Sequence, residues 1–571
     1  MKLEEKGTDY TQDGTVDLKG RPILRSNTGK WKTCYFFVGY EIFERMAYHG
    51  IASNLVIYLT RKLHEGTVTS SNNVTNWVGT VWLTPLLGAY IADTFLGRYW
   101  TFIVASAIYL VGMCLLTLAV SLPGLRPPSC GHQVKEVDCD RHASTFQVGI
   151  FYCALYIIAV GTGGTKPNIS TMGADQFDDF EHKERLQKLS FFNWWMFSVF
   201  IGILFSNTFL IYIQDNVGWE LGYGLPTLGL TVSILFFIVG TRYYRHKPPS
   251  DSPLNRMARV LVATVRKWKV VIPDEPKELY ELSLEEYSKP GMFRIDHTNS
   301  LSLLDKAAVE IGQNSPWMLC PVTQVEQTKQ MIKMIPILLA TFVPATMFAQ
   351  TNTLFIKQGT TLEKSIGPHF KIPPGCLSAF VTIFMLTSLV LYDRFFVPFV
   401  RRYTKNPRGI TLLQRFGIGL VLHIIVMGTA CLAERRRLRV AKENEIFEKN
   451  QIVPLSIFIL LPHLGTAYFT TSFGVGYFIS SFLLKTVADI TEKRGKGWIL
   501  DNLNVSRLDH YYAFLAVLCF LNLLYFLLVA KLFVYNTELK DTETELHEAI
   551  AARPNKSTRS EEKTLDDKAS S

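Results

Sequence analysis

Long apolar runs separated by short polar segments make up most of this chain. A helix of about 20 apolar residues is long enough to cross a lipid bilayer. Runs of this kind occupy residues 34–59, 75–92, 101–122, 147–164, 190–213, 222–240, 331–349, 374–392, 409–432, 452–484 and 510–535. The pattern predicts an all-α polytopic membrane protein, because a water-soluble protein spreads its apolar residues periodically instead.

The spacing of the runs divides the chain into five parts. We expect a cytosolic N-terminal tail (1–30), an N-terminal six-helix bundle (31–240), a cytosolic central loop (241–330), a C-terminal helical bundle (331–535) and a disordered tail (536–571). The last part is charged and rich in Thr, Ser and Lys, a composition that does not bury enough apolar surface to fold.

The central loop contains one further pattern. Leu254, Met257, Leu261, Val265 and Trp268 recur at helical spacing, and basic residues lie elsewhere on the helical wheel. Such a distribution predicts a basic amphipathic helix that lies at the inner membrane surface between the two halves.

Composition and charge narrow the class of protein. The chain has 571 residues, of which 48% are hydrophobic and 19% charged, and a net charge of +10. Its basic residues cluster in loops beside the apolar runs, for example at Lys183, Arg185 and Lys188. Cytosolic loops of membrane proteins carry this excess, so we expect a lipid bilayer and not nucleic acid as the partner. The cysteines lack metal-ligand spacing and no HExxH or GxSxG motif is present, so we expect neither a metal site nor an enzyme.

The first apolar run carries three neighbouring ionisable residues. Glu41, Glu44 and Arg45 stand at positions i, i+3 and i+4, so they share one face of a helix. Charged groups inside a membrane are costly and usually face a cavity or one another. One interpretation is a fixed ion pair that orients the helix. The other is a proton site, because two carboxylates that share one arginine leave one of them less well compensated.

Lys166 is a second ionisable residue in an apolar run, within GTGGTKPNIS. The glycines do not form a phosphate-binding loop, because the GxxxxGK[ST] pattern is absent and Pro167 follows the lysine. They suit close packing of helices instead. Lys166 can then hold a substrate carboxylate or balance the carboxylates of the first run. The alternative is a lysine that snorkels to the membrane interface.

The second and third runs are joined by a short turn in GAYIADTFLGRYWT. Asp93 can pair with Arg98 there, and this pair would latch one conformation. Thr101 lies three residues after Arg98, a spacing that basophilic kinases accept, and is a candidate phosphorylation site. Asn73 begins the sequon NVT and is a candidate glycosylation site on the outer side.

Together these motifs resemble a known family. The DxxxGR pattern at 93–98 resembles the signature of the major facilitator superfamily. The motifs ExxER at 41–45, GTGGTKPNISTMGADQF at 161–177, YDR at 392–394 and LLQRFGIG at 412–419 resemble the proton-coupled oligopeptide transporters, and more narrowly the plant nitrate/peptide transporters of the peptide-transporter-3-like type. The resemblance covers roughly residues 30–535. It implies two six-helix bundles that rock about a central site, powered by the proton gradient with no other cofactor.

The resemblance also implies roles for single residues. Glu41, Glu44, Arg45 and Lys166 would couple protons to transport, and Lys166, Tyr48 and Gln350 would bind the substrate.

Two substrate signatures of the family are changed in this chain. Peptide carriers often show INxGS in the fifth span, where VFIGI here places Phe200 and Ile203. Nitrate-type members use a histidine in the seventh span, where this chain has Phe348. Small peptides, nitrate and organic anions therefore all stay open as substrates.

The run 452–484 departs from the family pattern. Roughly thirty residues, enough for one span and its turn, are expected between His463 and Leu464. As one helix the run would be about 50 Å long, so we expect a tilted or broken single span with a kink at Pro462 and Gly465. Eleven spans would move the tail out of the cytosol, whereas twelve would place Asn504 outside. In the family topology the basic stretch 434–440 would lie outside, against the charge rule.

We therefore expect a proton-coupled symporter that moves small peptides or related small solutes by alternating access, with protons and the small-molecule substrate as its partners. The alternatives are a nitrate or organic-acid/hormone symporter and a truncated, non-transporting or regulatory isoform. Its expected location is the plasma membrane, and the alternative is a vacuolar or other internal membrane.

Overall fold

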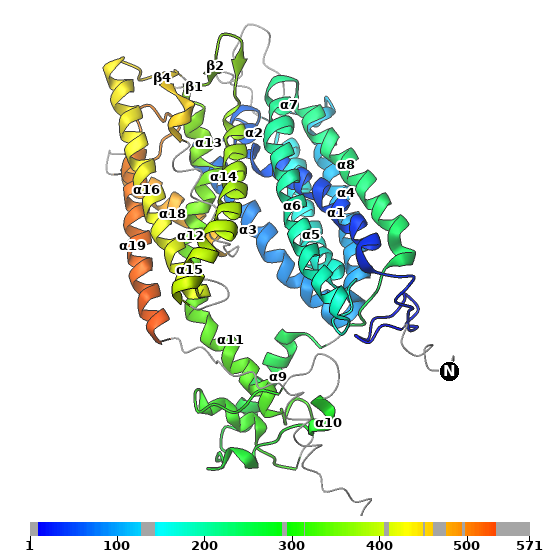
Figure 1. Ribbon diagram of the computed structural model, residues 1–571. Coiled ribbons are helices and arrows are strands. Elements are labelled where there is room, and N and C mark those ends of the chain that lie inside the picture. The colour runs from blue at the N-terminus through cyan, green and yellow to red at the C-terminus, as the bar shows by residue number, and fades with distance from the viewer. Residues whose placement is uncertain are drawn as a thin grey trace, which may run out of the picture. The chain divides into compact units, whose positions relative to one another are not determined.

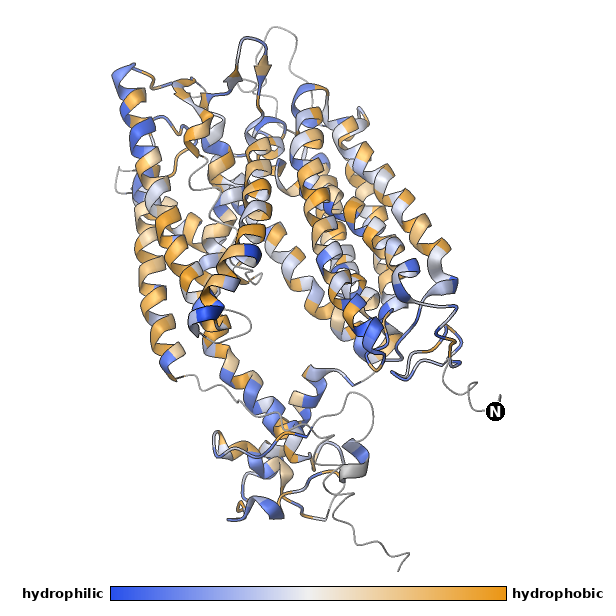
Figure 2. Ribbon diagram, viewed as in Figure 1, coloured by the Kyte–Doolittle hydropathy of each residue, from blue (hydrophilic) through white to orange (hydrophobic). Residues whose placement is uncertain are grey.

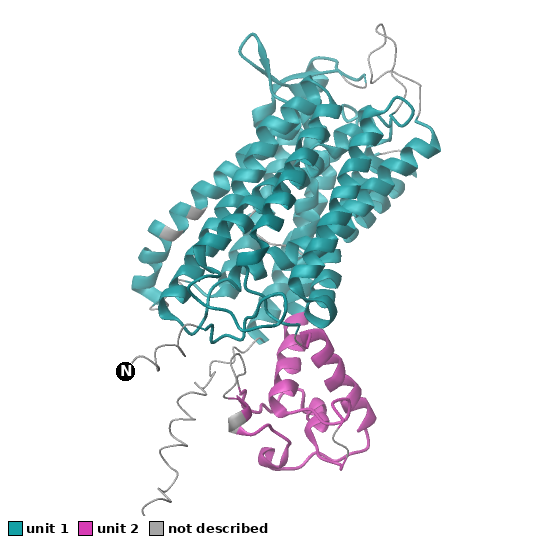
Figure 3. Ribbon diagram, turned by 90° about the vertical axis from the view of Figure 1, so that its right-hand side faces the viewer, with its two compact units in different colours: residues 1–250, 336–532 teal, residues 251–335, 533–571 magenta. Residues whose placement is uncertain are grey.

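The computed structural model describes residues 10–126, 143–249, 251–287, 294–312, 315–404, 410–448, 451–460, 475–493 and 497–532. Two compact units divide the chain, as Figure 3 shows. The first contains residues 1–250 and 336–532, and the second contains residues 251–335 and 533–571.

Long helices build the first unit (Figure 1). Its N-terminal half contains α1 (Lys30–Ala52), α2 (Leu55–Arg61), α3 (Thr67–Ile91), α4 (Gly97–Ser121), α5 (Thr145–Ala174), α6 (His182–Phe205), α7 (Ile211–Asn216) and α8 (Trp219–Val239). Its C-terminal half contains α12 (Phe342–Ala349), α13 (Leu354–Gly359), α14 (Leu377–Leu391), α15 (Val397–Thr404), α16 (Leu412–Glu443), α18 (Val475–Lys493) and α19 (Leu508–Leu532), and α11 (Val322–Ala340) leads into it.

Two small strand pairs lie in the C-terminal half. β1 (Leu362–Glu363) pairs in parallel with β4 (Val453–Ser456), and β2 (Ser365–Ile366) pairs antiparallel with β3 (Phe370–Lys371).

The predicted apolar runs fall on these helices, with the run 452–484 as the exception. Seven helices in the described ranges are long and apolar enough to cross a membrane. Hydrophobic residues cover the long helices of the first unit, and hydrophilic residues gather toward their ends (Figure 2). This distribution is the one that a bilayer requires.

The run 452–484 does not form one helix. Residues 453–456 form β4 and residues 457–460 a short 3-10 helix, whereas α18 begins only at Val475 and continues beyond the run to Lys493. The prediction of a single span over this run is therefore wrong at both of its ends. The expected kink at Pro462 and Gly465 lies outside the described residues.

The helices α16 and α19 run antiparallel to each other. Near the end of α16, Arg437 donates to the Leu503 carbonyl just before α19 begins (2.6 Å). Near the start of α16, the Phe416 ring lies 4.9 Å from the ring of Phe526, close to the end of α19. The chain therefore enters α19 on the face where α16 ends and leaves it on the face where α16 begins.

One contact relates these two faces to the N-terminal half. The Thr67 amide at the start of α3 binds Asp501 in the loop before α19, and α3 starts on the face where α1 ends. We call the face where α1 ends and α3 begins the outer face. The opposite face, where α1 begins and α19 ends, is the inner face. Asn504 thus lies on the outer face. Whether the chain crosses eleven or twelve times depends on residues 461–474, which lie outside the described residues.

Residues 10–29 form an N-terminal strap against the inner ends of the N-terminal half. Val16 and His246 exchange two backbone hydrogen bonds of 2.8 and 2.9 Å. Arg25 pairs with Asp178 (3.0 Å) and with Glu181 (3.2 Å). The described part of the expected tail is therefore folded onto the protein.

The second unit contains α9 (Pro253–Arg266), the short α10 (Leu284–Tyr287) and a 3-10 helix at 302–308. Val260 and Ala263 of α9 face its apolar core. The other face of the segment exposes Leu254, Leu261, Val265 and Trp268. The amphipathic helix is therefore present as predicted, and its place at the membrane surface stays a prediction.

One cluster in the second unit has the composition of a metal site. His297, Asp305 and Glu326 bring their ligand atoms within 4.8 Å of one another. However, Lys329 Nζ lies 2.7 Å from Asp305 Oδ1 and 2.8 Å from Glu326 Oε1, and its side chain is fully buried. The ammonium group is therefore already paired with both carboxylates, and the cluster is a buried ion-pair network.

Candidate functional site

The three ionisable residues of α1 lie on one face of the helix, as their spacing predicts. Arg45 Nε donates to Glu41 Oε1 at 2.6 Å and lies 3.0 Å from Glu44 Oε2. Both carboxylates are buried, at 0% and 1% exposure, so they share one guanidinium inside the protein. Gly202 of α6 permits this packing, because a Cβ there would collide with the Ile42 carbonyl oxygen and the Arg45 side chain.

The two carboxylates are not equally satisfied. Glu41 Oε1 accepts a hydrogen bond from Arg45, whereas neither oxygen of Glu44 accepts one from any residue in the described ranges. A buried carboxylate without donors is costly when it is ionised. Protonation of Glu44 therefore sacrifices no hydrogen bond to a described residue, whereas protonation of Glu41 would weaken the one it accepts from Arg45.

Lys166 reaches the same region from α5. Its Nζ is buried and lies 3.9 Å from the centroid of the Tyr48 ring and 5.0 Å from that of Trp82. Nζ donates no hydrogen bond to any described residue, but the charges of α1 act on it electrostatically. Two aromatic faces thus hold the ammonium near the carboxylates. A lysine that snorkels to the interface does not fit this buried position.

Glycines bring α5 into close contact with its neighbours. Pro167 has no amide hydrogen, so it leaves the Gly163 carbonyl without its helical donor. Gly88 of α3 faces this carbonyl, and a Cβ at Gly88 would collide with the oxygen. On the other side, Gly164 packs against Ala105 of α4 in the same way. The GTGG segment therefore serves helix packing, as predicted, and fixes the height at which Lys166 enters the site.

Gln350, the third residue expected to bind the substrate, lies in the C-terminal half. Gln350 is 1% exposed, and its Nε2 donates to the Thr346 carbonyl (3.0 Å) and to Ser480 Oγ of α18 (3.1 Å). Tyr477, one turn earlier in α18, belongs to the same apolar cluster as Tyr48. The two predicted pocket residues thus lie on different halves of the unit, and α18 contacts the surroundings of both.

Apolar packing replaces both substrate signatures. Phe200 and Ile203, at the positions of the polar residues in INxGS, are 2% and 3% exposed. Phe348, at the position of the span-seven histidine, packs edge-on against Tyr477 with 6.5 Å between ring centroids. These three side chains therefore provide apolar surface, and none of them provides a polar group to a substrate.

Arg98 makes its main contact with a residue that sequence reasoning missed. Arg98 Nη1 pairs with the carboxylate of Asp175 at the end of α5, whereas its Nε lies 3.8 Å from Asp93 Oδ1. Lys247 Nζ lies 3.5 Å from the other oxygen of Asp175. Asp175 is therefore the centre of the predicted latch, and Asp93 is at its edge. The signal was present in the sequence, because Asp175 stands in the GADQF motif.

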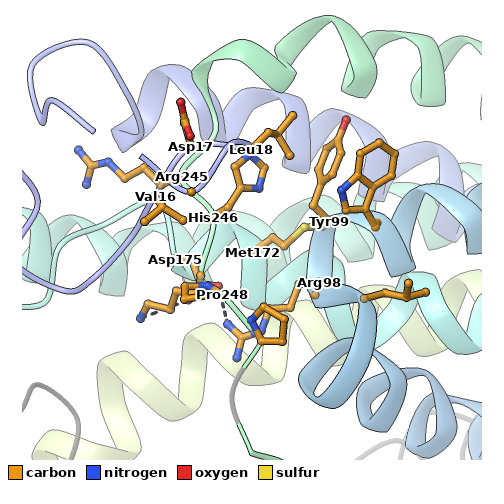
Figure 4. Close-up of a pocket in the computed structure, with 16 residues that line it drawn as sticks. Val16, Asp17, Leu18, Arg98, Tyr99, Met172, Asp175, Arg245, His246 and Pro248 are labelled. Carbon is orange, nitrogen blue, oxygen red and sulfur yellow. Dashed lines mark hydrogen bonds and ion pairs between the residues drawn. The ribbon is translucent and has the colours of Figure 1, made fainter. Parts of the chain in front are cut away.

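A cavity of about 210 Å³ lies beside this latch (Figure 4). Val16 and Asp17 of the N-terminal strap line it together with Arg98, Asp175 and His246. Burial lowers the pKa of His246 to about 4, so its imidazole is neutral near pH 7. The strap and the latch thus form one assembly on the inner face.

The candidate phosphorylation site does not fit this conformation. Thr101 is only 6% exposed, and its hydroxyl donates to the Gly97 carbonyl at 2.9 Å within α4. A kinase would have to open the inner end of α4 to reach it.

The candidate glycosylation site is also occupied by hydrogen bonds within the protein. Asn73 Nδ2, the atom that would carry a glycan, donates to Glu65 Oε2 (3.0 Å) and to the Tyr152 hydroxyl (2.7 Å). Asn504 is 6% exposed and donates to the carbonyls of Glu448 and Gln451. A glycan at either asparagine would require these bonds to break.

Two sets of long apolar helices, with buried charged residues in the N-terminal set, form an architecture of the major facilitator type. The chain belongs to the POT family, whose sequence pattern (PTR2) matches residues 99–506.

Close relatives support this membership. The chain is 55% identical to "Protein NRT1/ PTR FAMILY 5.2" of Arabidopsis thaliana, with 95% of this chain and 98% of the relative covered. Its identity to "Protein NRT1/ PTR FAMILY 8.1" of the same plant is 42%, with 93% and 99% covered. These names agree with the plant nitrate/peptide resemblance.

Solved structures agree with the fold. The POT family transporter PepTSo matches with a TM-score of 0.60 at 18% identity, over 88% of this chain and 98% of that one. An auto-inhibited POT family peptide transporter matches with a TM-score of 0.60 at 17% identity, over 90% and 99%.

The alignment with the first relative also bears on the expected gap. It runs over 572 positions but uses only 95% of this 571-residue chain, so about thirty aligned positions have no counterpart here. This number agrees with the roughly thirty residues expected to be missing, enough for one span with its turn.

Proposed function

We propose that this protein is a proton-coupled symporter that moves small peptides or related small solutes by alternating access. The observation that carries the proposal is the shared guanidinium: Glu41 and Glu44 are both buried, and Arg45 satisfies only one of them with a hydrogen bond. A carboxylate in this position can bind and release a proton as its surroundings change. The driving force is the proton gradient, with no further cofactor.

Lys166 supplies the substrate subsite in this proposal. A peptide carries a terminal carboxylate, and the buried Nζ is a cation without a hydrogen-bonded acceptor in the described ranges. An incoming carboxylate would gain a charge-assisted hydrogen bond there. Tyr48 and Gln350 would bound the same subsite from the two halves. The peptide transporters among the solved structures of this fold, such as the auto-inhibited one, favour this substrate class.

Nitrate or an organic acid is the alternative substrate. Both are anions that Lys166 can bind, and the relatives carry "NRT1" in their names. The apolar Phe348 at the span-seven histidine position weighs against nitrate, and the apolar Phe200 and Ile203 weigh against peptides.

A second candidate function follows from the missing positions. A chain that lacks about one span can be a truncated form that does not transport and regulates instead. The N-terminal half, which holds the charged triplet and Lys166, would be retained in either case.

Uptake in oocytes tests both candidates. The plasma membrane is the proposed location, so surface expression is measured first, with an internal membrane as the alternative. Dipeptides, nitrate and hormone-like acids are then offered in acidic and neutral medium, to this chain and to a version that carries the missing segment of its Arabidopsis relative. Acid-stimulated uptake by both chains supports the symporter. Uptake by the restored chain alone would overturn transport by this form.

A further inference from the structure

The start of α3 lacks a cap of its own. Its N-cap residue is Gly66, which has no side chain, and its first turn contains no acidic residue. The first amides of a helix have no intrahelical acceptor and carry the positive end of the helix dipole. The end of α3 therefore needs an acceptor from elsewhere.

Asp501 is this acceptor, and it belongs to the other half of the unit. The Thr67 amide donates to Asp501 Oδ1 at 2.5 Å, across 434 positions of sequence. Gly66 leaves room for the contact, because a Cβ there would already lie 3.0 Å from the same oxygen. The cap of an N-terminal helix is thus supplied by the loop between α18 and α19.

Buried side chains of α16 fix that loop. Arg437 donates to the Leu503 carbonyl (2.6 Å) and to Asn504 Oδ1 (2.8 Å). It also pairs through two nitrogens with Glu434, at 2.6 and 2.8 Å, and both side chains are 0% exposed. Asp501 stands two residues before Leu503, so this network holds it in place against α3.

Two more contacts join the halves on the outer face. The rings of Tyr212 and Phe370 stack with 5.8 Å between centroids, and Cys376 Sγ lies 3.8 Å from the Thr208 carbonyl. The latch around Asp175 on the inner face joins elements of the N-terminal half to one another. Separation of the halves at the outer face would therefore break the Asp501 cap and leave that latch intact.

We propose that Asp501 is a gating residue: as a helix cap supplied across the two halves, it stabilises the conformation in which the outer face is closed. The inference rests on the alternating access in the proposed function. It does not depend on which residue carries the proton or on which substrate is moved. Glu434 and Arg437 act as positioning residues for the cap.

Spin-label distances test the cap directly. Labels are placed at the exposed Thr69 of α3 and Lys442 of α16, with Cys114, Cys130, Cys139 and Cys153 replaced by serine, in protein reconstituted in lipid. We expect Asp501→Ala to raise the ratio of long to short distances about fivefold, the usual effect of losing an N-cap. Glu363→Ala, which removes an outer-face carboxylate that accepts a hydrogen bond from the nearby Ser365 of the same half, should leave the ratio unchanged.

A second variant removes the donor without touching the loop. Proline is well tolerated at the first position of a helix, and the extended Gly66 before it suits a following proline. Thr67→Pro should therefore cause the same shift as Asp501→Ala, and the double variant should add nothing further. Unchanged distances in both single variants, or additive shifts in the double variant, would overturn the proposal even if transport were proton-coupled.

Discussion

The Lys166 ammonium rests on the face of the Tyr48 ring, with 3.9 Å between Nζ and the ring centroid. Within the described part of the chain, no carboxylate lies within ion-pair distance of this nitrogen. A cation held by a ring keeps its hydrogen-bond donors free for an anion. The two residues thus present to the site a positive charge whose donors are available to an anion.

Loss of the ring face should weaken substrate binding. Tyr48→Leu removes the cation–π contact, which is worth about 1–2 kcal/mol when desolvated, and should raise the KM for an anionic substrate roughly tenfold. Tyr48→Phe keeps the ring face and should stay within about threefold of the original KM, by the same estimate. Concentration-dependent uptake at one pH measures both. Equal KM changes in the two variants would show that the hydroxyl, and not the ring, matters.

Asp175 should matter more than Asp93 on the inner face. Asp175→Asn removes the charge that both Arg98 and Lys247 contact, whereas Asp93 lies 3.8 Å from Arg98 and is only partly buried. Ion pairs at partly exposed positions contribute about 0.2–1 kcal/mol each, so we expect a change of about threefold in maximal uptake rate for Asp175→Asn and less for Asp93→Asn. Asp17→Asn, in the wall of the same cavity, is the control. A larger effect of Asp93→Asn would contradict this ranking.

Lys364 should make stability depend on pH. Burial, reinforced by the charge of Arg61, lowers the pKa of this outer-face lysine from 10.5 to about 8. The folded protein therefore binds this proton less tightly than the unfolded chain. The resulting cost is fully present below pH 8 and fades as the pH rises from 8 toward 10.5, so stability should increase across this window.

Thermal unfolding in detergent measures this effect. Lys364→Met removes the titrating group, and the wild-type protein should gain up to about 3 kcal/mol relative to this variant between pH 7 and pH 10. A difference between the two proteins that stays constant with pH would refute the assignment to Lys364.

The Glu434–Arg437 pair should be far more sensitive to single than to double replacement. Arg437→Leu leaves a buried, uncompensated carboxylate and should destabilise the protein by about 3–5 kcal/mol, whereas replacing both partners with leucine should cost much less. Thermal shift of Arg437→Leu and of the double variant measures this. A double variant less stable than Arg437→Leu would indicate that the arginine contributes mainly through the loop carbonyls.

The same pair explains a charge pattern that the sequence left open. The stretch ERRRLRV at 434–440 lies on the outer face, where basic residues are disfavoured. Arg437 is neutralised by Glu434 within the protein, and Arg435 lies 3.5 Å from Asp509. Part of the positive charge is therefore cancelled locally, which hydropathy and charge counting alone do not show.

Short-range geometry was predictable from the sequence, and long-range partners were not. The shared face of Glu41, Glu44 and Arg45 follows from helical periodicity alone. The partner of Arg98 is 77 positions away, and that of Thr67 is 434 positions away. Such partners depend on how helices pack, which no local pattern encodes.

The prediction of a single span over residues 452–484 was wrong for a different reason. Apolar content alone does not separate a strand from a helix in a short segment. The strand β4 covers VPLS at 453–456, where Pro454 disfavours a helix interior and the neighbouring Thr361 and Leu362 offer pairing partners.

In the proposed function a carboxylate of α1 carries the coupled proton, and Glu44 is the one to test. Glu44→Gln keeps the shape of the side chain but does not bind a proton. Because neither Glu44 oxygen accepts a hydrogen bond in the described ranges, the variant should fold. Glu220→Gln, an exposed residue paired with Arg126, is the matched control.

Substrate exchange and acid-driven accumulation are measured side by side in vesicles that contain the variant. Exchange needs only the rocking of the two halves, whereas accumulation needs the proton. We predict that Glu44→Gln abolishes acid-driven accumulation and leaves exchange within about twofold of wild type, a change of less than 0.5 kcal/mol. Equal loss of exchange and accumulation would contradict it and would assign Glu44 to folding or helix orientation instead.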